Sequence, residues 1–225
     1  MRETSRSGPA LYGHRGGERG PENSLAAVRG AIDVGADGVE IDIRISPEGV
    51  AVTGHDPFDS DRTTDAEGAP VTLRELLAVI EDAGIDLLID FKSDGAPDRE
   101  AAVVAETLAA GRRPELVLVS SFSIPFLEQL GRLTTNHPLI PIVSLRQNFP
   151  WPGRFDRWDG VSVLAAAMAV NPLLAFRLHR RGGRLLVWFG FTAWSPVIRA
   201  AVALGAEALI VAEVDRTFEI LSSRR

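Results

Sequence analysis

Short apolar runs alternate with longer amphipathic segments along almost the whole chain, and this alternation restricts the possible folds more than any other feature. Strands that alternate with helices imply parallel strands joined by crossover helices. The expected strands are Ala10–Gly13, Gly38–Ile43, Val50–Thr53, Asp86–Phe91, Leu116–Ser120, Leu139–Val143, Gly160–Leu164, Arg184–Trp188 and Glu207–Val211. The expected helices include Ser24–Val34, Thr72–Ala83, Asp98–Ala110, Ile124–Leu133, Pro172–Arg180 and Pro196–Ala203.

The number of expected strands exceeds by one the eight of a closed (β/α)₈ barrel. The segment Ser46–Gly49 explains the surplus, because its SPEG sequence is a tight turn that is too short for a parallel crossover. Val50–Thr53 is therefore expected to fold back antiparallel on the second strand. We predict an α/β protein with a (β/α)₈ TIM-type barrel and a β-hairpin after the second strand.

Length and composition indicate a single domain and argue against disulfides, a nucleic-acid surface and a membrane span. The chain has 225 residues, and no Ser/Gly/Pro-rich linker divides it, so we expect one domain over residues 1–225. It has no cysteine, which excludes disulfides and thiolate metal sites. The net charge of −6 argues against a nucleic-acid surface. The polar start and the absence of a long apolar run predict a cytoplasmic protein without a transmembrane segment.

The segment from Gly13 to His55 concentrates polar side chains beside turns and strand ends. They are His14, Arg15, Glu22, Asn23, Glu40, Asp42 and His55. Metal-assisted hydrolysis of a phosphate ester needs carboxylates for the ion, a cation for the phosphate and imidazoles for proton transfer. Each residue also has a structural explanation, since a lone histidine often only caps a loop and an acid and an amide can cap a helix. Their concentration in one segment favours a functional site.

Two strands carry pairs of charged residues at a spacing that places both members on one face. Glu40 and Asp42 form one pair, and Asp90 and Lys92 form the other near the end of a later strand. Catalytic groups of βα barrels lie at the carboxyl ends of the strands, so these side chains are expected to converge at one mouth of the barrel. Solvated strand-end acids and a simple Asp90–Lys92 ion pair are the structural alternatives.

Lys92 is the only lysine among 24 basic residues, the others being arginine. Chance can account for one residual lysine. A functional explanation is a site that needs a compact ammonium, which the planar guanidinium of arginine does not replace.

These motifs together resemble the glycerophosphodiester phosphodiesterase family. The resemblance rests on Gly13-His14-Arg15-Gly16, on Pro21-Glu22-Asn23-Ser24, on the segment Gly35–Asp42 and on His55-Asp56-Pro57. Asp90-Phe91-Lys92, Ser120-Ser121-Phe122, Trp188 and the segment Gly205–Val211 extend it along nearly the whole chain.

The resemblance implies a metal-dependent phosphodiesterase that uses Mg²⁺ or Ca²⁺. It implies that His14 and His55 are the general acid and base, without deciding which is which. It further implies metal ligation by Glu40, Asp42, Asp90 and Glu22, and binding of substrate and phosphate by Arg15, Lys92, Asn23 and Trp188.

The chain departs from the family pattern at three places. Asp90 stands where the family usually has glutamate, which implies weaker or water-mediated ligation. The closing strand runs Ile210-Val211-Ala212-Glu213 instead of ending in a Thr-Asp pair, which leaves the role of Glu213 open. The insertion after His55 is short, covering only Pro57–Pro70, and suggests an open pocket.

Our main hypothesis is hydrolysis of a glycerophosphodiester to glycerol 3-phosphate and an alcohol, by a monomer or homodimer that acts on a small-molecule phosphodiester. A lysophospholipase D or sphingomyelinase D-like enzyme would use the same side chains on a lyso-lipid. A phosphate-binding barrel without catalysis is the third possibility. A glycosidase would leave the histidines, Arg15 and Lys92 unexplained.

Overall fold

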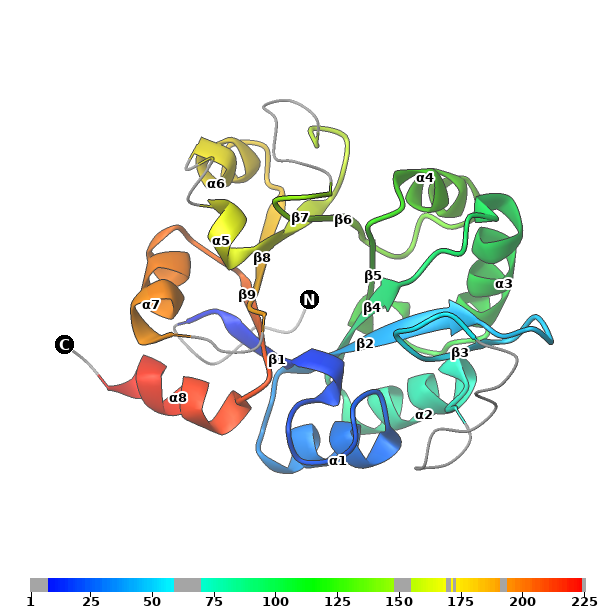
Figure 1. Cartoon of the computed structure of the whole chain (residues 1–225), viewed down its shortest axis with the longest axis horizontal. Coiled ribbons are helices and arrows are strands. Elements are labelled where there is room, and N and C mark those ends of the chain that lie inside the picture. Colours follow the sequence, from blue (N-terminus) through cyan, green and yellow to red (C-terminus); the bar gives the residue numbers. More distant parts are fainter. Residues whose placement is uncertain are drawn as a thin grey trace.

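The computed structural model describes residues 8–58, 70–147, 155–168, 171, 173–190 and 194–223. Strands form a ring around a central axis and helices surround it (Figure 1). The strands are β1 (Ala10–Gly13), β2 (Gly38–Ile45), β3 (Ala51–Thr53), β4 (Asp86–Phe91), β5 (Val117–Ser121), β6 (Leu139–Val143), β7 (Gly160–Leu164), β8 (Arg184–Trp188) and β9 (Ala208–Val211).

The sheet closes because its first and second strands pair with each other. Its order is β1-β9-β8-β7-β6-β5-β4-β2-β3, and the additional parallel pairing of β1 with β2 completes the ring. β3 pairs only with β2 in this order, and that pairing is antiparallel, with Ile43 opposite Thr53. The predicted barrel and the predicted hairpin are both confirmed.

Helices follow most strands and pack on the outside of the ring. They are α1 (Leu25–Asp33), α2 (Leu73–Ala83), α3 (Pro97–Ala109), α4 (Ile124–Leu133), α5 (Ala165–Met168), α6 (Leu173–His179), α7 (Ser195–Ala203) and α8 (Val214–Ser222). Two short 3₁₀ helices are η1 (His14–Gly16) and η2 (Pro114–Leu116). Ser24 caps α1 through a bond from the Ala27 amide, and Thr72 and Glu75 form the capping box that their spacing predicts for α2.

Alternation along each strand builds two separate apolar cores. On β2, Val39, Ile41 and Ile43 are fully buried in the layer between the ring and the helices. The opposite faces of the strands fill the barrel interior with Tyr12, Leu88, Leu118, Ile140, Leu186, Ala208 and Ile210. The acids of β2 alternate with its outward-facing residues, so they lie on the inner face.

Two features of the fold differ from expectation or lie beyond it. The helices α5 and α8 and the two 3₁₀ helices were not expected from the sequence, whereas the other α-helices and all the strands were. Most of the short insertion Pro57–Pro70 falls on residues 59–69, outside the described residues. In the part of the chain that the structure describes, no helix has the length and hydropathy of a membrane span.

Candidate active site

Three buried carboxylates meet at the mouth of the barrel. Glu40, Asp42 and Asp90 offer oxygen atoms that all lie within 4.8 Å of one another. Asp42 and Asp90 are register partners on β2 and β4, which explains their approach. Oδ1 of Asp90 is buried and has no hydrogen-bond partner among the described residues. An all-oxygen set with an unpartnered carboxylate oxygen fits a hard divalent cation such as Mg²⁺ or Ca²⁺.

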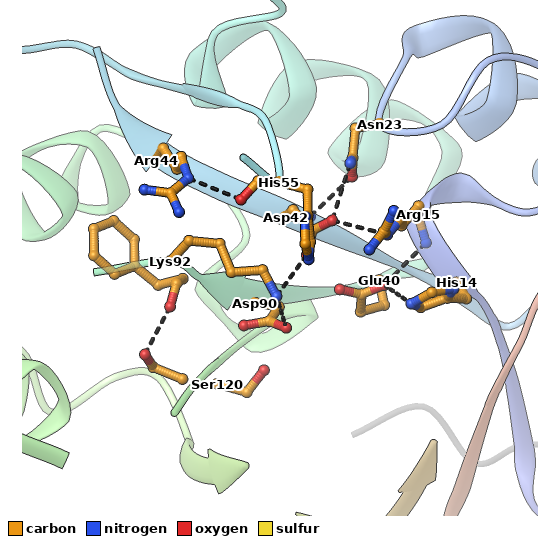
Figure 2. A network of polar contacts seen from close by, with 12 residues as sticks. His14, Arg15, Asn23, Glu40, Asp42, Arg44, His55, Asp90, Lys92 and Ser120 are labelled. Carbon is orange, nitrogen blue, oxygen red and sulfur yellow. Dashed lines mark hydrogen bonds and ion pairs between the residues drawn. The ribbon is translucent and has the colours of Figure 1, made fainter. Parts of the chain in front are cut away.

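The ammonium of Lys92 lies against this cluster (Figure 2). Its Nζ is 2.5 Å from Oδ2 of Asp90 and 2.9 Å from Oδ1 of Asp42. Burial alone would lower the pKa of Lys92, but the two carboxylates outweigh it and raise the pKa. Lys92 therefore carries a full positive charge and offsets part of the negative charge of the acids.

The acids respond differently to their shared burial. Burial, together with the charges of Asp42 and Asp90, raises the pKa of Glu40 well above its usual range. Burial raises the pKa of Asp90 to about 6, against the opposing charge of Lys92. Burial would also raise the pKa of Asp42, but Lys92, Asn23 and Arg15 lower it overall. The buried acids carry more negative charge than Lys92 and Arg15 balance, and a bound divalent cation would supply the remaining positive charge.

Asp42 is oriented by the segment that follows β1. Asn23 donates from Nδ2 to Oδ2 of Asp42 and accepts the Asp42 amide on Oδ1, both at 3.0 Å. Nε of Arg15 lies 3.1 Å from the same Oδ2. Arg15 and Asn23 are the two non-glycine residues with positive φ in the described chain, at 51° and 60°. Such backbone strain is typical of functional sites.

His14 lies beside the acids at the end of β1. Its Nε2 is 3.8 Å from Oε2 of Glu40, too far for a hydrogen bond, while Oε2 accepts the Arg15 amide at 2.9 Å. Burial and the neighbouring Arg15 charge lower the pKa of His14. Its imidazole is therefore neutral near neutral pH and able to accept a proton.

His55 follows β3 and is more exposed, with 44% of its side chain accessible. Its Nδ1 is 2.8 Å from Oδ1 of Asp56. The bond to His55 lowers the pKa of Asp56, so this carboxylate is ionised and can only accept. Nδ1 must then carry the hydrogen, which leaves Nε2 of His55 for proton transfer. Asp56 was not among the predicted site residues, although its place in the His-Asp-Pro motif was a signal.

One side of the mouth is aromatic. Trp188 ends β8 and meets Phe122 edge to face, with ring centroids 6.4 Å apart. Nζ of Lys92 lies 5.9 Å from the centroid of Phe122. Among the described residues, the buried Nε1 of Trp188 has no hydrogen-bond partner. The aromatic pair gives this side of the barrel mouth an apolar surface next to the ammonium of Lys92.

Two acids named in the sequence lie away from the cluster. The side chain of Glu22 is 67% exposed and pairs with Nη1 of Arg15 at 2.6 Å, so it is not a member of the buried acid group. Glu213 precedes α8 and pairs with Arg216 at 2.7 Å. The structure thus brings together Glu40, Asp42, Asp90 and Lys92, and places Glu22 with Arg15.

The N-terminal part of the chain is similar to known proteins. Residues 14–88 match the family model "Glycerophosphoryl diester phosphodiesterase family". The chain is 39% identical over 90 residues to a glycerophosphodiester phosphodiesterase of Caldanaerobacter subterraneus subsp. tengcongensis. That alignment covers 39% of this chain and 36% of the relative, so the match spans about a third of the relative's length.

Solved structures share the whole fold at low sequence identity. A glycerophosphodiester phosphodiesterase from Parabacteroides distasonis superposes with a TM-score of 0.84 at 19% identity, covering 96% of this chain and 98% of that one. A phosphodiesterase from Oleispira antarctica, solved with the product sn-glycerol-3-phosphate, gives 0.81 at 22% identity with the same coverage. The barrel fold is that of these proteins, and residues 14–88 of the chain are similar to the glycerophosphoryl diester phosphodiesterase family.

Proposed function

We propose that this protein hydrolyses glycerophosphodiesters to glycerol 3-phosphate and an alcohol, with a divalent cation, Mg²⁺ or Ca²⁺. The observation that carries the proposal is the convergence of three buried carboxylates with Lys92, Arg15 and His14 at the carboxyl ends of the barrel strands. His55 lies close by, on the loop that follows β3 (Figure 2). This is the set of groups that metal-assisted phosphodiester cleavage requires.

Glu40, Asp42 and Asp90 would hold the cation. When bound, it would neutralise charge on the phosphate and assist the departure of the alkoxide. The unpartnered Oδ1 of Asp90 and the excess of negative charge in the cluster both support this assignment. The exposure of Glu22 and its bond to Arg15 favour a different role, that of orienting the guanidinium.

The cationic side chains would hold the phosphate. Arg15 is fixed by Glu22 and Asp42, so its guanidinium is positioned before substrate arrives. Lys92 would turn from its carboxylates towards a phosphoryl oxygen as a compact charge. Asn23 has both polar atoms of its amide on Asp42, which supports a role in orienting that carboxylate.

The histidines would move the protons. The neutral state of His14 favours it as the base that takes a proton from the nucleophile, either water or a neighbouring hydroxyl of the substrate. His55, whose Nδ1–H faces Asp56, would act as the acid in its imidazolium form and donate the proton on Nε2 to the leaving oxygen, which returns the ring to its neutral form. Trp188 would contact the apolar part of the substrate.

A lyso-lipid is the second candidate substrate for the same machinery. The aromatic pair Trp188 and Phe122 supports it, because an apolar wall beside the phosphate site suits an acyl chain. A lysophospholipase D or sphingomyelinase D-like reaction would break the corresponding phosphodiester. Faster turnover of lysophosphatidylcholine than of glycerophosphocholine would favour this reading.

The direct test measures release of glycerol 3-phosphate from glycerophosphocholine and glycerophosphoethanolamine. The protein is treated with EDTA, and Mg²⁺, Ca²⁺ or Mn²⁺ is then restored. Turnover that returns with the metal supports the proposal. A folded protein without turnover on these diesters or on lyso-lipids, with any metal, would contradict it and favour a phosphate-binding barrel.

A further inference from the structure

Arg44 is a buried arginine that has no part in the site described above. It lies two residues after Asp42 on β2, and only 9% of its side chain is exposed. Burial of a guanidinium is costly unless its N–H groups donate to acceptors or its charge is paired with a carboxylate. Its contacts therefore indicate what it holds in place.

One contact is the main chain of His55. Nε of Arg44 donates to the carbonyl oxygen of His55 at 2.9 Å (Figure 2). The preceding amide, that of Gly54, donates to the carbonyl oxygen of Asp42 at 3.0 Å. Two consecutive residues of this loop are thus tied to β2, one by the backbone and one by Arg44. Because 44% of the His55 side chain is exposed and, in the described part of the chain, its ring is held only by the neighbouring Asp56, its position depends on these main-chain bonds.

The other contact is the carboxylate of Asp94, which pairs with Nη1 of Arg44. Asp94 belongs to the turn between Lys92 and α3. The carboxylate of Glu100, in α3, accepts hydrogen bonds from this turn. Glu100 is 3% exposed and accepts the Ser93 hydroxyl at 2.6 Å and the Asp94 amide at 2.7 Å. The partner of Arg44 is therefore itself fixed.

We propose that Arg44 is a positioning residue for His55, with Asp94 fixing the orientation of its guanidinium. The inference rests on the proposed function, in which His55 transfers a proton. Arg44 bridges the loop that carries His55 and the turn that follows Lys92. It therefore sets the distance between this loop and this turn. Displacement of a catalytic group by about 1 Å can cost about 10²-fold in rate. The planar fork that spans both contacts is not reproduced by lysine.

A double-mutant cycle tests the proposal in the metal-loaded protein with glycerophosphocholine. Arg44→Ala should lower kcat by about 10- to 100-fold with KM changed by less than about threefold. In the His55→Ala background, Arg44→Ala should cause no further loss, since it acts through His55. Arg44→Lys should recover only part of the rate. A kcat of Arg44→Ala within about twofold of wild type, or losses that add in the double variant, would overturn the proposal.

Two further variants separate positioning from general damage. Arg112→Ala removes an arginine that pairs with Glu81 and Asp82 at the opposite end of the barrel, and it should leave kcat unchanged. Asp94→Ala removes a half-exposed carboxylate and leaves Arg44 in place. It should lower kcat in the same direction as Arg44→Ala but by less, which keeps the test valid should Arg44→Ala fold poorly.

Hydrogen exchange provides a readout that does not depend on turnover. The Gly54 amide should exchange about tenfold faster in Arg44→Ala than in wild type or Arg112→Ala. Unchanged protection of Gly54 would overturn the positioning role. Loss of protection in a protein that cleaves no diester would instead support the positioning role and contradict the proposed reaction, so the two failures are distinguishable.

Discussion

Asp42 and Asp90 face each other across neighbouring parallel strands, and the ammonium of Lys92 lies within 2.9 Å of Asp42 and 2.5 Å of Asp90. This contact uses the one lysine of a chain that otherwise relies on arginine. A single ammonium can approach two carboxylates in a confined space, whereas a guanidinium is wider and planar.

Replacing Lys92 by arginine should therefore impair the proposed hydrolysis although the charge is kept. We expect kcat to fall by about 10-fold or more, because the fork displaces Asp42 or Asp90 and cannot follow the phosphate as a point charge. Steady-state kinetics on glycerophosphocholine give the value. Full activity of Lys92→Arg would mean that the lone lysine is a coincidence of composition.

The histidines should be indispensable for turnover and dispensable for folding. His14→Ala and His55→Ala should each lower kcat by about 10²–10⁴-fold, the usual worth of a proton-transfer group. Circular dichroism should stay native, because both rings lie at the mouth of the barrel and not in either apolar core. A variant that keeps full activity would lose the role assigned to its histidine.

Metal binding should depend on the buried acids and not on Glu22. Asp90→Asn and Glu40→Gln should each weaken Mg²⁺ or Ca²⁺ binding by at least about tenfold, as measured by titration calorimetry. Glu22→Gln is the matched control, because its carboxylate is exposed and bound to Arg15. A large loss of affinity in Glu22→Gln would return Glu22 to the ligand set that the family resemblance implies.

The barrel could be predicted from sequence because its signals are local. Apolar alternation located strands such as Asp86–Phe91 and Leu139–Val143 at their observed bounds, and the Ser46–Gly49 turn identified the hairpin. α5 has only four residues, too few for a helical period to be recognised. α8 carries apolar residues at helical spacing, at Val214, Phe218 and Leu221, and this pattern is a sequence signal for the helix.

The part of the site that could be predicted from sequence is the set of side chains at the ends of strands, because the strand determines where these side chains lie. The i, i+2 spacing and the position at strand ends predicted that Glu40, Asp42 and Asp90 lie together at the barrel mouth, and in the structure their carboxylates do lie close to one another. Partners that come from distant turns gave no such signal. The bond of Arg44 to His55, the support of Asp94 by Glu100 and the engagement of Asn23 with Asp42 all depend on how loops meet in three dimensions.

At the other end of the barrel, the pair Tyr12 and Asp86 should make stability depend on pH. The Tyr12 hydroxyl donates to Oδ2 of Asp86 at 2.7 Å. Burial raises the pKa of Asp86 above its value in the unfolded chain, although the bond from Tyr12 opposes the rise. The folded state thus holds the proton more tightly. The resulting stabilisation is complete below the unfolded-state pKa of about 3.9 and is lost as pH rises through the folded-state pKa.

Asp86→Asn removes this titration while keeping an oxygen acceptor for Tyr12. The free energy of unfolding of Asp86→Asn, relative to wild type, should therefore increase as pH rises from about 4 and level off once Asp86 is fully ionised. Urea unfolding at a series of pH values measures the difference. Tyr12→Phe should make the pH dependence of the wild-type aspartate steeper, because the hydroxyl that stabilises its charge is gone. A difference between Asp86→Asn and wild type that does not change with pH would show that Asp86 ionises in the fold as it does in the unfolded chain.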